Sequence, residues 1–114
     1  MEEPYWATEI IKEVCLQYNR RIPEVVWRQR KGIYTTGTTY RKKDRITITL
    51  GTDTIDHKRV LLHELAHYLN KSEKRGHTKE FWLILRALFI KYDCLTDEYR
   101  QRESKYRVNS LLYL

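Results

Sequence analysis

Val60-Leu61-Leu62-His63-Glu64-Leu65-Ala66-His67 is an apolar run that holds two histidines four residues apart and contains no proline or glycine. Such a run is typical of a buried helix. Each helical residue advances by about 100°, so His63 and His67 share one face and their ring nitrogens can converge on a single ion. Glu64 points to the neighbouring face, where it is placed to take a proton from a water activated by the ion. The run therefore predicts a metal-binding hydrolytic site.

A second interpretation of the run is a core helix whose histidines only form hydrogen bonds to nearby backbone. Two polar rings on one face of an apolar helix need partners that satisfy them, and a shared ion meets that need. Asp56, near the start of the apolar run, is the predicted cap of the helix.

Catalytic zinc commonly has three protein ligands, so a third residue is required. His57 precedes the apolar run and is interpreted as a surface or first-turn residue. His77 follows a polar loop, residues 70–76, and begins a second pattern of helical spacing that includes Phe81. If this second helix packs on the first, His77 faces the same interior as the other two histidines. His77 is therefore the predicted third ligand.

Two carboxylates compete with His77 or support it. Glu73 lies in the polar loop, and Glu80 follows His77 by three residues. Glu80 can be read as a partner for a ligand imidazole or as a solvated glutamate favoured by the helix dipole. The residues alone leave these alternatives open.

The run from Val60 to His67, followed by Gly76-His77-Thr78-Lys79-Glu80-Phe81-Trp82, resembles the SprT-like (Spartan-related) zinc metallopeptidases, and the YgjP-like metallopeptidases are similar in the same region. The resemblance covers about residues 22–92. It implies that Zn²⁺ is bound by His63, His67 and His77 and that Glu64 is the general base or acid. It also implies a minimal zincin-like core: an N-terminal helix, a three-stranded antiparallel sheet and two metal-bearing helices.

The remaining sequence predicts one α+β domain over residues 1–114. Apolar residues at helical spacing predict a first helix over residues 5–19, and three runs predict strands over residues 25–30, 33–40 and 45–50. A capped segment from Thr96 predicts a C-terminal helical tail. The two cysteines, Cys15 and Cys94, lie in apolar surroundings without metal-ligand spacing, so reduced core thiols are expected and the zinc ribbon of larger relatives is absent.

Positive charge is concentrated in one part of the chain. The 22 basic and 15 acidic residues give a net charge of +7, and residues 20–45 contain nine of the basic residues against Glu24 and Asp44. Such a concentration is typical of a phosphate-binding face, with Trp27, Tyr34 and Tyr40 as base-stacking surfaces. A solvated sheet face with its aromatics in the core explains the pattern equally well. The residues predicted to contact nucleic acid are Arg28, Arg30, Lys31, Arg41, Lys42, Lys43 and Arg45.

Together these features predict a zinc-dependent endopeptidase that acts on a protein or peptide, with DNA-associated or DNA-crosslinked proteins as the substrates that the resemblance implies. A strand edge near Leu50 is expected to hold the peptide by strand addition. The alternatives are a zinc hydrolase with another substrate and a nucleic-acid-binding module. No segment reaches the ~18–20 apolar residues of a membrane span, and the acidic start is unlike a signal peptide, so we expect a cytoplasmic protein that does not contact membranes.

Overall fold

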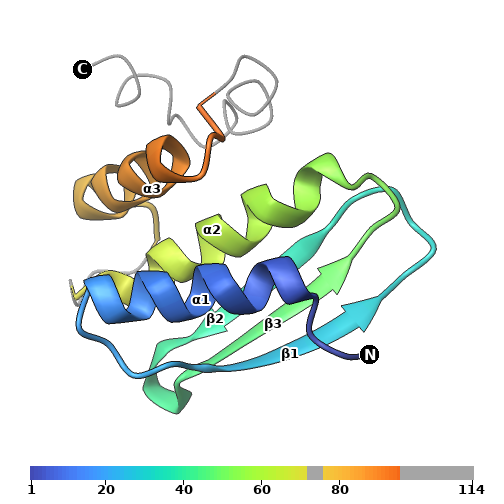
Figure 1. Ribbon diagram of the computed structural model, residues 1–114, viewed down its shortest axis with the longest axis horizontal. Coiled ribbons are helices and arrows are strands. Elements are labelled where there is room, and N and C mark those ends of the chain that lie inside the picture. Colours follow the sequence, from blue (N-terminus) through green and yellow to red (C-terminus); the bar gives the residue numbers. More distant parts are fainter. Residues whose placement is uncertain (72–75, 96–114) are drawn as a thin grey trace.

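The computed structural model describes residues 1–71 and 76–95, which form helices on one side of a small sheet (Figure 1). The predicted α+β class, the leading helix and the two later helices are confirmed, whereas the helix predicted from Thr96 lies outside the described residues. In chain order the elements are α1 (Tyr5–Gln17), β1 (Glu24–Gln29), β2 (Thr36–Tyr40), the 3₁₀ helix η1 (Arg41–Lys43), β3 (Arg45–Leu50), α2 (Ile55–Leu69) and α3 (Lys79–Lys91).

The sheet is mixed, so the prediction of an antiparallel sheet is wrong for one of its two strand pairs. Its strand order is β1-β3-β2, in which β2 and β3 are antiparallel and β1 and β3 are parallel. β3 is therefore the central strand, and the expectation of an exposed edge along the strand that ends at Leu50 is also wrong. The two edges of the sheet are β1 and β2.

The parallel pair arises because the segment between β1 and β2 is not a hairpin turn. It passes over the end of β3, where the amides of Thr52 and Asp53 donate to the carbonyls of Gly32 and Ile33 at 2.9 and 3.1 Å. A Cβ atom at Gly51 would lie 2.3 Å from the Ile33 carbonyl oxygen, so only glycine permits this crossing. The crossing leaves room for β3 between the two earlier strands, and β2 begins at Thr36 instead of residue 33.

The core lies between the sheet and the helices. Alternate residues of β3, namely Ile46, Ile48 and Leu50, are buried against the helices, and each contributes roughly 1.5–3 kcal/mol of stability. α2 is buried along most of its length and lies between the sheet and α3 (Figure 1). Cys15 and Cys94 are buried and are not joined by a disulfide, and burial raises the pKa of the Cys15 thiol to about 11.

Trp27 belongs to the core, so the prediction that it stacks on nucleic-acid bases is wrong. It is 5% exposed, and its ring meets that of Trp6 edge-to-face at 6.2 Å between centroids. Its indole nitrogen donates a hydrogen bond of 3.0 Å to the Glu3 carboxylate. The other two aromatics, Tyr34 and Tyr40, are exposed.

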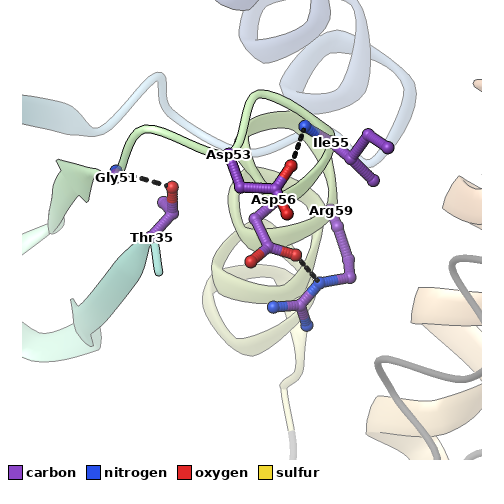
Figure 2. A network of polar contacts seen from close by, with 6 residues as sticks. All are labelled: Thr35, Gly51, Asp53, Ile55, Asp56 and Arg59. Atoms are coloured by element: carbon purple, nitrogen blue, oxygen red, sulfur yellow. Dashed lines mark hydrogen bonds and ion pairs between the residues drawn. The ribbon is translucent and has the colours of Figure 1, made fainter. Parts of the chain in front are cut away.

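The start of α2 differs from the predicted cap (Figure 2). Thr54 is the N-cap residue, and the Asp53 carboxylate accepts the amide of Ile55 at 3.2 Å. Asp56 lies inside the first turn, where it is buried and accepts a hydrogen bond of 3.1 Å from the Arg59 guanidinium. The buried ion pair, not a cap, is thus the role of Asp56.

Candidate metal centre

The structure brings the three predicted ligands together. His63 and His67 lie one turn apart on α2, and the Nε2 atoms of His63 and His77 are 3.1 Å apart. One ring nitrogen from each histidine lies within 4.8 Å of the other two. In residues 1–71 and 76–95 this is the one group of three or more potential ligands that converges in this way.

The donor set suits a zinc ion. Imidazole nitrogen is a preferred zinc ligand, and Zn–N bonds of about 2.0–2.1 Å in a tetrahedral site separate neighbouring nitrogens by roughly 3.3 Å. The 3.1 Å separation between His63 and His77 is close to that spacing. Three protein ligands would leave a fourth position for water or substrate, the arrangement typical of catalytic zinc.

His77 precedes α3 instead of lying within it. It comes directly before Thr78, the N-cap residue, whose hydroxyl accepts the amide of Phe81 at 3.3 Å. The same hydroxyl accepts the side-chain amide of Asn70 at 3.3 Å, and Arg41 donates to the Asn70 carbonyl at 2.8 Å. The end of α2 and η1 therefore hold the start of α3 in place, and with it the third histidine.

Phe81 packs among the three imidazoles. Its ring stacks on His67 at 4.3 Å between centroids and 26° between planes, and it meets the rings of His63 and His77 at 4.9 and 4.7 Å. Phe81 is fully buried at the interface of α2 and α3. These contacts with the Phe81 ring help to keep the three imidazoles close together.

The other residues considered as ligands lie elsewhere. His57 is in the first turn of α2, as predicted, and its Nε2 atom is 2.7 Å from the Gly51 carbonyl oxygen. Glu80 is exposed in the first turn of α3 and is not a member of the histidine group. Glu73 lies outside the described residues.

Glu64 is buried beside the histidines and held by the edge strand β2. The Thr39 hydroxyl lies 2.9 Å from both Oε1 of Glu64 and the Glu64 backbone carbonyl oxygen, and its single proton is shared between these two acceptors. Thr39 and Gly37 share the helix-facing side of β2, because they pair with Ile46 and Ile48 of β3. Neither residue was predicted from the sequence; the only available signal is that they are two residues apart on a predicted strand.

Gly37 gives the Glu64 side chain its space. A Cβ atom at position 37 would lie 2.6 Å from Cγ and 3.1 Å from Cδ of Glu64. We therefore expect Gly37→Ala to displace the carboxylate and to lower kcat/KM of any reaction that uses Glu64 as its base by about 10²-fold, the cost of a displacement near 1 Å. Metal content should stay unchanged, since the three histidines lie on α2 and just before α3 and not on β2. The control is Thr47→Ala, on the opposite face of β3; equal activity of the two variants would contradict the role of Gly37.

Two cavities meet at Glu64. The larger, of about 710 Å³, contains the three histidines and is lined at one end by Arg41, Lys42 and Lys43. The smaller, of about 440 Å³, is lined in part by Arg30, Tyr34 and the buried pair of Asp56 and Arg59. Gly37, His63 and Glu64 line both cavities.

The seven predicted nucleic-acid contacts do not form one patch. Arg41, Lys42 and Lys43 line the larger cavity. The strand register places Arg28 and Arg45 on the sheet face that points away from the helices, and Arg45 forms an ion pair of 3.6 Å with Glu24. Arg30 and Lys31 are exposed in the segment that follows β1.

Comparison with known proteins gives one match. Residues 7–103 match the sequence profile of the SprT-like family, a longer range than the 22–92 expected from the motifs. No curated protein and no solved structure matches the chain. Within the described residues, no helix combines the length and the apolar character needed to cross a membrane.

Proposed function

The chain belongs to the SprT-like family, and we propose on that basis that it is a zinc-dependent endopeptidase. The observation that carries the proposal is the convergence of His63, His67 and His77 beside a buried glutamate, Glu64, which the edge strand holds in place. Three ligands that leave an open position, with a carboxylate beside them, are an arrangement suited to metal-assisted peptide hydrolysis.

The chain's own residues have separate tasks in this proposal. His63, His67 and His77 would hold the zinc ion, which when bound supplies a Lewis acid and activates a water molecule for attack on the scissile carbonyl. Glu64 takes the proton of the attacking water and then delivers it to the leaving amine. Thr39 keeps the carboxylate oriented through both transfers by donating to Oε1.

The substrate would bind along β2. β2 pairs with β3 on one side and has no second strand neighbour among the described residues, so its outer edge offers backbone groups for strand addition. β2 also lines the cavity that contains the histidines. An extended polypeptide added to this edge would run beside the strand whose Gly37 and Thr39 contact Glu64.

Cleavage of an unfolded protein tests the peptidase proposal. The zinc-loaded chain should cut denatured casein at internal bonds, lose this activity with a chelator and regain it when zinc is restored. A parallel assay with single- and double-stranded nucleic acid covers the rival zinc hydrolase. Nuclease activity without proteolysis would overturn the proposal.

We extend the proposal to substrates that are bound or crosslinked to DNA, with Arg28, Arg30 and Lys31 as contacts outside the larger cavity. Phosphate contacts release counterions, so DNA should stimulate cleavage at low salt and lose this effect as salt rises. Arg28→Ala combined with Lys31→Ala should make the slope of log K for DNA binding against log salt less steep, by the amount expected for about two lost phosphate contacts. Lys12→Ala, an exposed charge on α1, is the control. Absence of both binding and stimulation would leave a peptidase without a DNA requirement.

A further inference from the structure

The charge lining the larger cavity is uneven. Arg41, Lys42 and Lys43 from η1 line one end, and Glu64 is the one acidic residue among the described residues of the lining. Glu64 lies with the histidines, where metal charge would offset its own. An anionic group that enters at the η1 end therefore meets three positive charges. Among the described lining residues, no carboxylate lies beside these charges to repel it.

η1 is anchored, so its backbone keeps a fixed position relative to the end of α2. The Arg41 guanidinium donates to the carbonyl of Asn70 at the end of α2, with an N–O distance of 2.8 Å. Asp44 then ends η1 in the left-handed conformation, with φ of 47°, and its carbonyl accepts the amide of Glu24 at 2.9 Å. Arg41 thus has a structural task, and Lys42 and Lys43 present their exposed side chains beside the site.

The edge of β2 leads directly from Glu64 to these lysines. Gly37 and Thr39 contact Glu64, and Lys42 and Lys43 follow Thr39 by three and four residues. The chain rises about 3.3 Å per residue from Thr39 to the start of η1 and about 2.0 Å per residue within this 3₁₀ helix, so Lys42 and Lys43 lie roughly 9–11 Å along the chain from Thr39. An extended polypeptide aligned with β2 covers that distance in about three residues. Side chains about three or four positions from the scissile bond would lie at the η1 end of the cavity.

We propose that Lys42 and Lys43 form a subsite for acidic side chains, so that the enzyme prefers polypeptides with Asp or Glu three or four positions to one side of the cleaved bond. This inference rests on the proposed peptidase function. A cavity of about 710 Å³ has the size of a ligand pocket and admits an extended polypeptide, but it is too small for a nucleic-acid duplex. Carboxylates are the anions that a polypeptide carries into such a cleft.

The test uses quenched fluorescent peptides that share one neutral core. The third and fourth positions on either side of the cleaved bond carry Asp-Glu, Asn-Gln or Lys-Lys, and kcat/KM is measured at low and high salt. Two exposed charge pairs should favour the acidic peptide over the amide peptide by about 3- to 10-fold on one side of the bond, less at high salt. Equal rates for the acidic and amide peptides would overturn the subsite.

Reversing the charge of the two lysines tests whether they cause the preference for acidic peptides. Lys42→Glu combined with Lys43→Glu should reverse the order so that the Lys-Lys peptide is cleaved fastest, while Lys12→Glu on α1 should leave the preference unchanged. An equal change in both variants would show a bulk charge effect and overturn the proposal. Circular dichroism and the melting temperature show whether each variant is folded.

A competing nucleic-acid ligand has a distinct outcome. If a single-stranded oligonucleotide inhibits cleavage of the acidic peptide competitively, and the inhibition disappears with Lys42→Glu and Lys43→Glu, these lysines bind phosphate and the peptide assignment is wrong. DNA stimulation that depends on Arg28 and Lys31, but leaves the acidic preference intact, supports separate sites for the two anions.

The failure of this inference differs from the failure of the proposed function. Zinc-dependent cleavage of the neutral peptide without an acidic preference removes the subsite alone. If no peptide is cleaved, the peptidase proposal fails, and the subsite is tested by fluorescence anisotropy of the acidic peptide bound to the Glu64→Gln chain. Binding that falls at least about 3-fold on reversal of Lys42 and Lys43 supports the subsite; unchanged binding overturns it.

Discussion

Glu64→Gln is expected to lower kcat/KM for peptide cleavage by about 10²- to 10⁴-fold, the usual contribution of a positioned general base. The amide has nearly the same shape as the carboxylate but cannot accept the proton of the attacking water. Because Glu64 is not a member of the histidine group, zinc should bind with its normal stoichiometry. Initial rates with a quenched peptide, together with zinc content by atomic absorption, measure both effects.

Glu80→Gln is the matched control, since Glu80 is an exposed carboxylate in the first turn of α3. Its kcat/KM should stay near that of the unaltered chain. Full activity of Glu64→Gln would exclude Glu64 as the proton acceptor. A large loss in Glu80→Gln instead would give the acid–base role to the start of α3.

His77→Ala is expected to produce the largest loss of zinc affinity that does not alter α2. Loss of a partner that only supports a ligand typically costs about 10- to 100-fold in metal affinity, so removal of the ligand itself should exceed that range. Competition with a chromophoric chelator measures the affinity. His77 is exposed and lies outside α3, so the fold should persist.

Two further variants give zinc affinities with which that of His77→Ala can be compared. His57→Ala removes an imidazole that contacts the Gly51 carbonyl, and it should leave zinc affinity unchanged. Asn70→Ala removes the amide that bonds Thr78, and its cost should be smaller than that of His77→Ala. Unaltered zinc affinity in His77→Ala would mean that the third ligand is another residue.

The helices were predictable because apolar residues recur at helical spacing along each of these segments. The apolar spacing around His63 is that of a helix with most faces buried, and α2 has this burial. The strand order was not predictable in the same way, since the sequence of each strand does not show which other strand it pairs with. The parallel pairing of β1 with β3 depends on a six-residue crossing that Gly51 permits, and nothing in the three strand sequences distinguishes this crossing from a hairpin.

The residues of the candidate site also fall into two groups: those predictable from local spacing and those set by the packing of distant segments. His63 and His67 followed from helical geometry, and His77 followed from its place before a second apolar helix, because two packed helices leave few other positions for a third nitrogen. Gly37 and Thr39 could not be predicted, since their contacts with Glu64 depend on the register between β2 and β3 and on the packing of α2 against the sheet. The excess of positive charge in residues 20–45 is visible in the sequence. Only the fold shows which of these basic residues line the cavity and which lie on the outer face of the sheet.

The meeting of the two cavities at Glu64 bears on where in a polypeptide the chain would cut. An enzyme that trims residues from a chain end needs a closed wall on one side of its metal and a group that binds the terminal charge. Here Gly37, His63 and Glu64 line both cavities, so among the described residues the space beside Glu64 belongs to two cavities and not to one closed pocket. For the proposed peptidase, two cavities that share these walls would suit the middle of an unfolded segment, and scission at interior bonds is therefore expected over trimming from the ends.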